Sequence, residues 1–135
     1  MIERVLDING RELGILTDAR TPRIYRLLTG RDIMIDMVII QAYQAERAKM
    51  DDGDLHINMD ITVQALQAFE DLTYVMARQY AAHHGEEIPD TADEWLEGYE
   101  IMDVYMVMPM IVDIWTESCR TTSTAKKKPV KRSGK

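Results

Sequence analysis

The sequence contains a single cysteine, Cys119, among its 135 residues. A chain with one cysteine cannot form an internal disulfide framework, which fits a reducing compartment. The longest apolar run, residues 104–112, is too short to span a bilayer. The N-terminus does not have the pattern of a secretory signal peptide. We therefore expect a protein of the cytoplasm, with no membrane partner.

Glycine and proline are scarce as well, at seven and four residues. Long stretches with helical spacing of apolar residues dominate instead, and 46% of the chain is hydrophobic, which is enough for one core. The sequence predicts an α+β fold that is predominantly helical, with an N-terminal β-hairpin packed on roughly four to five helices. We expect one domain over residues 1–119 and a disordered tail over residues 120–135.

Charge is divided unevenly between these two parts. Residues 1–119 hold all 23 acidic residues against nine Lys or Arg, a formal charge of about −14. The tail contains no acid and seven basic residues: Arg120, Lys126, Lys127, Lys128, Lys131, Arg132 and Lys135. A basic tail favours an anionic partner such as nucleic acid, whereas the acidic body argues against one.

Residues 3–16 are typical of a β-hairpin. Two short apolar segments flank Asn9-Gly10, and both turn residues tolerate positive φ. Because an isolated hairpin is marginally stable, we expect it to lie on helices or on another subunit. The residues predicted for self-association are Val5, Ile8, Leu13 and Ile15.

The rest of the chain is expected to be helical, with boundaries set by capping residues and glycines. Pro109 should kink or split the last helix. The expected helices are 21–30 with Thr21 as cap, 32–50 with Asp32 as cap, 61–84 with Asp60 as cap, a short helix after the Thr91–Glu94 capping box, and 101–120.

The long helix over 61–84 shows the clearest apolar stripe, which is expected to face the core. Polar residues, Gln79 among them, are predicted to lie off that stripe. The stripe comprises Ile61, Ala65, Ala68, Phe69, Leu72, Val75, Met76 and Tyr80.

Two other stretches, 33–40 and 102–115, are apolar nearly all round and rich in methionine. Methionine packs adaptably and is common on surfaces that bind clients of several shapes. Such stretches are either core or covered by another chain. The residues predicted to bind a client are Met102, Tyr105, Met106, Met108, Met110, Ile111 and Trp115, with Ile33, Met34 and Met37 in second place.

An acidic pattern raises the alternative of an enzyme. Glu86-Glu87, followed by Glu100 and Asp103, fits loosely the all-α nucleotide pyrophosphatases, in which carboxylates hold Mg²⁺. However, Glu86-Glu87 sits between Gly85 and Pro89, and no Lys or Arg lies between residues 79 and 119 to hold a phosphate. The acidic residues are better interpreted as solvated surface, and no cofactor, metal or catalytic residue is predicted.

Two further motifs contain residue types that bind metal ions, but their spacing indicates a structural role. Asp51–Asp54 lacks the ligand spacing of a calcium loop and is expected to be an acidic turn. His83 and His84 are adjacent, so on a helix they point about 100° apart and do not form a metal-binding pair. We expect them to form a polar helix end.

A series of short motifs carries a family resemblance. The motifs are Ile8–Gly10, Tyr25–Ile33, Leu72–Ala77, Glu94–Tyr99 and Ile114-Trp115. Their order resembles that of the tail assembly chaperones of long-tailed phages that infect Gram-positive bacteria, over roughly residues 2–118.

The resemblance implies a non-enzymatic function. Proteins of this family coat the tape-measure protein and keep it soluble in the host cytoplasm. A longer form, made by a programmed frameshift, recruits tail-tube protein, and the chaperones leave as the tube polymerises, so they are absent from the mature virion. The resemblance therefore implies two partners, the tape-measure and tail-tube proteins, and a homo-oligomer.

The tail fits this resemblance at the level of the gene. Ala125-Lys126-Lys127 can be encoded by codons that end in A-AAA-AAG, on which ribosomes slip backward. The chain would then be the short form of a frameshift pair. The sequence leaves open whether the tail itself binds an anionic partner.

Overall fold

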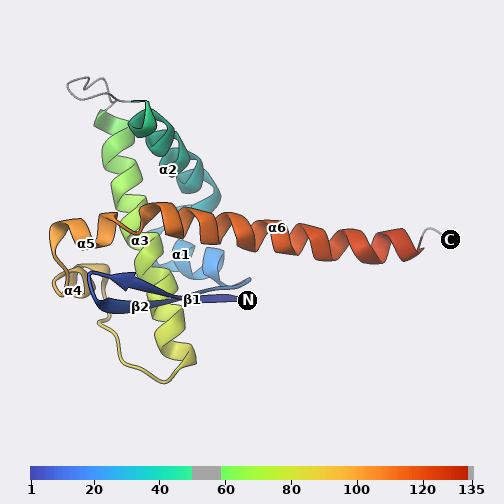
Figure 1. Cartoon of the computed structure of the whole chain (residues 1–135), viewed down its shortest axis with the longest axis horizontal. Helices are drawn as coiled ribbons and strands as arrows, with labels where there is room; N and C mark the ends of the chain where they lie inside the picture. The colour runs from blue at the N-terminus through green and yellow to red at the C-terminus, as the bar shows by residue number, and fades with distance from the viewer. Residues whose placement is uncertain (50–58, 134–135) are drawn as a thin grey trace.

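The computed structural model describes the backbone of residues 1–49 and 59–133, and the side chains of residues 1–49 and 62–120. The predicted acidic turn at residues 51–54 and the Asp60 cap lie outside the described side chains. The elements are β1 (Ile2–Ile8), β2 (Arg11–Thr17), α1 (Thr21–Thr29), α2 (Ile33–Ala48), α3 (Met59–His83), α4 (Ala92–Leu96), α5 (Ile101–Tyr105) and α6 (Met108–Ser133). This confirms the predicted α+β, predominantly helical fold (Figure 1).

The two strands form the expected antiparallel hairpin. Ile8 pairs with Arg11, and Ile2 at the far end pairs with Thr17. Asn9 and Gly10 have φ of 50° and 86°, which is the left-handed turn that the Asn-Gly pair predicts. The amide of Gly10 also donates to Asp7 Oδ1 at 2.8 Å. The turn residues therefore set the hairpin register.

Helix α3 is the central element of the domain. It contacts β2, α1, α2 and α4, and Figure 1 shows it running through the middle of the molecule. Residues 72–77 are buried without interruption, so this part of the helix has no solvent face. The predicted stripe is thus confirmed as core over Ala65–Met76, with Tyr80 half-buried, whereas its first residue, Ile61, lies outside the described side chains.

The prediction for Gln79 was wrong, because Gln79 is buried although its polarity placed it off the stripe. Its Oε1 accepts from the Thr21 hydroxyl at 2.6 Å, and its Nε2 donates to Asp18 Oδ1 at 3.1 Å. A buried amide is tolerated when it is hydrogen-bonded in this way. The contact ties the end of α3 to the β2–α1 connection.

The caps of α1 and α2 agree with the sequence in part. Gly30 ends α1 with φ 75°, and the side chain of Asp32 caps α2 by accepting from the Met34 amide at 2.8 Å. Thr21, however, is the first residue of α1 rather than its cap. Its hydroxyl accepts from the Asp18 amide at 3.0 Å, on the preceding turn.

A partly buried charged cluster joins α1, α2 and α3. The Tyr25 hydroxyl donates to Asp36 Oδ2 at 2.5 Å, and Arg31 donates to Asp36 and Asp71 at 2.9 and 2.6 Å. Burial, with the hydrogen bond to Asp36, raises the pKa of Tyr25 above its ordinary value. Because each charge has a partner, the cluster fixes the three helices without leaving an isolated buried ion.

The last part of the chain is split at Pro109, as the sequence predicts. Helix α5 ends at Tyr105, and α6 begins at Met108, with Pro109 in its first turn. Proline is tolerated there because first-turn amides have no helical acceptor. A short non-helical link at residues 106–107 therefore separates α5 from α6 (Figure 1).

The backbone of α6 continues beyond residue 120. Helix α6 continues to Ser133, and Figure 1 shows this end extending well past the rest of the molecule. Alanine and lysine are good helix formers, so Ala125–Lys128 extend a helix that the core-packed residues have already begun. The disorder expected for residues 120–135 stays a prediction.

Candidate functional site

The main apolar hollow among the described residues is a groove of about 430 Å³ between α2, α3 and the α5–α6 corner. We call it the methionine groove. Its walls are mostly apolar. It is lined by Tyr43, Gln44, Arg47, Leu66, Met102, Tyr105, Met106, Met108 and Pro109.

Residues on both sides of the break between α5 and α6 form one wall of this groove. The Val107 amide donates to Val104 at 3.2 Å, and the Ile111 amide donates to Val107 at 2.9 Å, so both helices are hydrogen-bonded up to the corner. Met102 and Met106 remain 63% and 51% exposed beside it. Met102, Tyr105, Met106 and Pro109 are spaced three and four residues apart, so these side chains lie on one face of the segment and line the same hollow.

Helix α5 is held against α3 by Tyr105. Its hydroxyl donates to Glu70 Oε2, and its ring lies 6.1 Å from that of Phe69. The hydrogen bond to Glu70 and partial burial raise the pKa of Tyr105 to about 12. The Tyr105 hydroxyl therefore keeps its proton, and remains a hydrogen-bond donor in the groove wall, to a higher pH than an ordinary tyrosine.

The hairpin tip holds the other side of α5. Asn9 Nδ2 donates to Asp103 Oδ1 at 2.6 Å, and the second oxygen of Asp103 accepts from the Glu100 amide at 3.2 Å. Next to it, Arg11 donates to the Gly98 carbonyl and lies 4.1 Å above the Tyr99 ring. The turn that the sequence predicted therefore positions the helix that lines the groove.

The predicted client-binding residues fall into two groups. Met102, Tyr105, Met106 and Met108 line the methionine groove, with Met108 only 6% exposed, and Met34 and Met110 are exposed outside its lining. Ile33, Met37, Ile111 and Trp115 are buried in the core and do not line the groove. A client surface built on the native fold therefore does not include these four.

Sequence reasoning missed the second half of α2. Tyr43 and Arg47 line the groove one turn apart, and Leu66 reaches it from α3. The spacing of Tyr43 and Arg47 was visible in the sequence as an i, i+4 pair. Nothing local indicated that this face of α2 meets the α5–α6 corner.

The residues predicted for self-association are mostly inaccessible. Ile8, Leu13 and Ile15 are buried against the core, whereas Val5 is exposed. Gly14 explains the close packing, because a Cβ at this position would collide with the Tyr80 ring. Of the four residues, only Val5 lies on the described surface.

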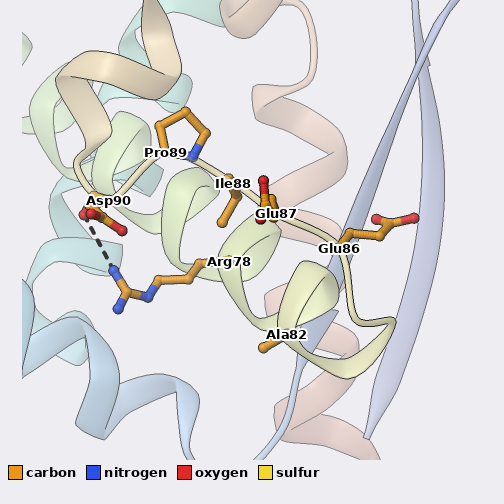
Figure 2. Close-up of a pocket in the computed structure, with 7 residues that line it drawn as sticks. All are labelled: Arg78, Ala82, Glu86, Glu87, Ile88, Pro89 and Asp90. Atoms are coloured by element: carbon orange, nitrogen blue, oxygen red, sulfur yellow. Dashed lines mark hydrogen bonds between the residues drawn. The ribbon is translucent and has the colours of Figure 1, made fainter.

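A second hollow, of about 460 Å³, lies between the end of α3 and the following loop (Figure 2). Arg78 points into it and donates to the Tyr74 hydroxyl and the Asp90 carbonyl, each at 3.3 Å. Glu86 and Glu87 point away from this guanidinium (Figure 2). The hollow is open and charged, and its cation already bonds to the protein.

The acidic pattern of the pyrophosphatase alternative is spread over different environments. Glu86 and Glu87 are exposed in a loop, whereas Asp103 is buried and bonded to Asn9 and the Glu100 amide. Within residues 1–49 and 62–120, no three His, Cys, Asp or Glu side chains are placed to hold a metal ion.

The predicted polar end of α3 is seen at His83 and His84. His84 Nε2 lies 3.1 Å from Glu3 Oε1, and its ring stacks 4.1 Å from that of Tyr80. The contact between His84 and Glu3 therefore links the C-terminal end of α3 to β1.

None of the helices in the described ranges combines the length and apolar character of a bilayer-spanning segment. Comparisons with protein-family models, curated proteins and solved structures found no match. The motifs of the chain and the geometry of the groove are therefore the features that bear on its function.

Proposed function

We propose that this protein is a tail assembly chaperone that binds an apolar helix of a phage tape-measure protein in the methionine groove. The proposal joins the motif resemblance to one structural observation. That observation is the groove itself, in which Met102, Met106 and Met108 from the α5–α6 corner face α2 and α3.

The groove has properties that suit a helical client. Grooves that bind amphipathic helices have apolar walls which accept side chains spaced three and four residues apart. Methionine side chains are flexible and polarisable, so they adapt to different apolar sequences along a long client. A chaperone that coats such a client needs this tolerance more than it needs tight specificity.

The charge of the domain suits the same function. Residues 1–119 carry a formal charge of about −14. Net charge of one sign keeps a protein soluble and opposes non-specific association. An acidic domain that covers the client's apolar surface would therefore keep the complex soluble in the host cytoplasm until tube assembly displaces it.

Co-expression with the tape-measure protein tests the proposal. The wild-type chain should increase the soluble fraction of that protein and co-purify with it. The variant Met102→Asp/Met106→Asp should lose this activity, because two carboxylates would have to be desolvated in the groove. Both positions are more than half exposed, so the variant should still fold.

Met34→Asp is the matched control, since Met34 is a methionine of 58% exposure on α2 that does not line the groove. It should leave client solubility unchanged. Equal solubility with wild-type and groove variant chains would contradict the proposal.

Deletion of residues 121–135 separates the chaperone from the rival nucleic-acid function. If the groove binds the client, the truncated chain keeps it soluble. If the protein acts through its basic tail on nucleic acid, the truncated chain loses nucleic-acid binding and the groove variants retain it.

The gene offers an independent test. We propose that the chain is the short form of a frameshift pair whose longer form recruits tail-tube protein. The codons for residues 125–127 should then read as an A-AAA-AAG slippery run, followed by an overlapping −1 frame. Lysine codons that cannot slip, with no overlapping frame, would contradict the frameshift.

A further inference from the structure

Helix α1 exposes two leucines away from the core. Leu27 and Leu28 are 70% and 46% exposed, whereas Thr21 and Tyr25 on the same helix are fully buried. These two leucines are candidates for contact with another surface, provided that the groups around them also suit one. This face is separate from the methionine groove, which α1 does not line.

The same helix carries cations without carboxylate partners. Of the four arginines in residues 20–31, Arg20 pairs with Asp18, and Arg31 pairs with Asp36 and Asp71. Within the described residues, Arg23 and Arg26 form no ion pair, and both are exposed. In a domain of strongly negative charge, these are cations available to a partner.

An acidic surface begins beside the leucines. Leu28 lines a small hollow together with Asp90, Thr91 and Ala92. Residues 86–100, of which these form part, hold seven carboxylates and no Lys or Arg. Among them Asp90 and Asp93 have exposed side chains. The nearby Arg78 donates to the Tyr74 hydroxyl and to the Asp90 carbonyl, and Figure 2 shows the second of these bonds.

Helical geometry gives the order of these groups across the surface. Measured from the buried Tyr25, Leu28 lies about 60° to one side, where it meets the acidic loop. Leu27 and Arg23 lie roughly opposite Tyr25, and Arg26 lies about 100° to the other side. Across this surface, the acidic loop is therefore followed by the two leucines and then by the two arginines.

From this arrangement we infer that two copies of the chain associate through this surface about a two-fold axis. A two-fold interface places the same patch against itself, so each charged half must meet its opposite. Rotation about an axis near Leu27 brings the arginines of one copy over the acidic loop of the other. A partner of uniform charge would leave one half of the surface unmatched, so a second copy fits best.

The leucines and the charges contribute differently to such a dimer. Leu27 and Leu28 would lose water on association, which supplies the non-directional part of the affinity. The charge pairs would fix the orientation and oppose other arrangements, because like charges would meet if the two patches were rotated wrongly. This inference does not depend on the proposed chaperone function.

Sedimentation analysis of the full chain at micromolar concentrations tests the inference. The wild-type chain should be a dimer. Arg23→Glu and Asp93→Lys should each weaken dimerisation by roughly tenfold, because each change places two like-charge contacts in one dimer. Leu27→Ser, at a side chain largely exposed in the monomer, should also weaken it.

Mixing the two charge variants provides the decisive comparison. An Arg23→Glu chain and an Asp93→Lys chain should form a heterodimer of wild-type affinity, since both contacts between them are attractive again. Arg120→Glu, at an exposed arginine on α6, makes the same charge change and should leave the dimer intact. Far-ultraviolet circular dichroism of each variant controls for folding.

Three results would overturn the inference. They are a wild-type monomer at high micromolar concentration, unchanged dimerisation of Arg23→Glu and Asp93→Lys, and a mixture that does not restore affinity. Open, growing assemblies in place of a closed dimer would also contradict the two-fold arrangement.

Discussion

Residues 33–40 and 102–110 are similar in sequence and different in structure. Both are methionine-containing stretches that are apolar nearly all round. The first forms part of one uninterrupted helix, α2, and exposes the strip Met34, Ile35 and Val38. The second spans the break between α5 and α6 and lines a groove together with side chains of α2 and α3. The difference teaches that composition indicates an apolar surface, whereas packing beside other helices gives that surface a shape.

The largest expected effect on stability comes from truncating a buried side chain of the groove-lining segment. Ile111 is fully buried one turn after the corner. Ile111→Ala should destabilise the fold by about 2–5 kcal/mol, since it leaves a cavity. Val38→Ala, on the exposed strip, should change stability by no more than about 0.5 kcal/mol. Urea denaturation measures both, and equal losses would contradict this assignment of core and surface.

The next largest effect on stability is expected where the hairpin packs against α3, at Gly14. Gly14→Ala should cost about 1–3 kcal/mol, because a new methyl group would force the Tyr80 ring aside. Thermal unfolding of Gly14→Ala and of Gly14→Ala/Tyr80→Ala tests the cause. The double variant should recover the part of the loss that is due to the collision, and no recovery would exclude it.

The hairpin tip links the fold to the groove and should have a smaller effect. Asn9→Ala removes the bond to Asp103 and places alanine at positive φ, with an expected cost of about 1–2 kcal/mol. Asn9→Gly restores the backbone freedom but not the bond. Hydrogen exchange of the α5 amides should accelerate in both variants. Unchanged exchange with Asn9→Gly would mean that the side-chain bond does not hold α5.

The smallest effect is expected at Tyr105, where Tyr105→Phe removes one hydrogen bond, worth about 1 kcal/mol. Its pKa is raised from the ordinary 10.0 to about 12 in the fold. The stabilising contribution is therefore complete below pH 10 and lost as pH rises toward 12. Wild-type stability should fall more steeply than that of Tyr105→Phe over this range. Parallel pH profiles would contradict the bond to Glu70.

Local signals in the sequence were sufficient for most of the fold. Asn9-Gly10 fixed the hairpin turn, Asp32 and Gly30 fixed helix ends, and Pro109 fixed the break, because each acts through its own backbone. Gln79 was misplaced because its partners, Thr21 and Asp18, are distant in sequence. Polarity alone does not reveal a buried amide whose hydrogen bonds are all tertiary.

The site was predictable only in part for the same reason. The methionines at 102, 106 and 108 were found from composition, and the structure places them around one groove. Tyr43, Arg47 and Leu66 complete that groove through contacts between helices that are far apart in the chain. Burial of Ile33, Met37, Ile111 and Trp115 also depends on packing, so no local pattern separated them from the surface methionines.

Oxidative footprinting of methionines in the complex with the tape-measure protein tests the central claim most directly. It compares the two methionine-containing stretches in one wild-type molecule. The account predicts that the client protects Met102 and Met106 from oxidation, while Met34 on α2 is oxidised as fast as in the free protein. Protection of Met34, with unchanged oxidation of Met102 and Met106, would contradict it and assign the client to the exposed strip of α2.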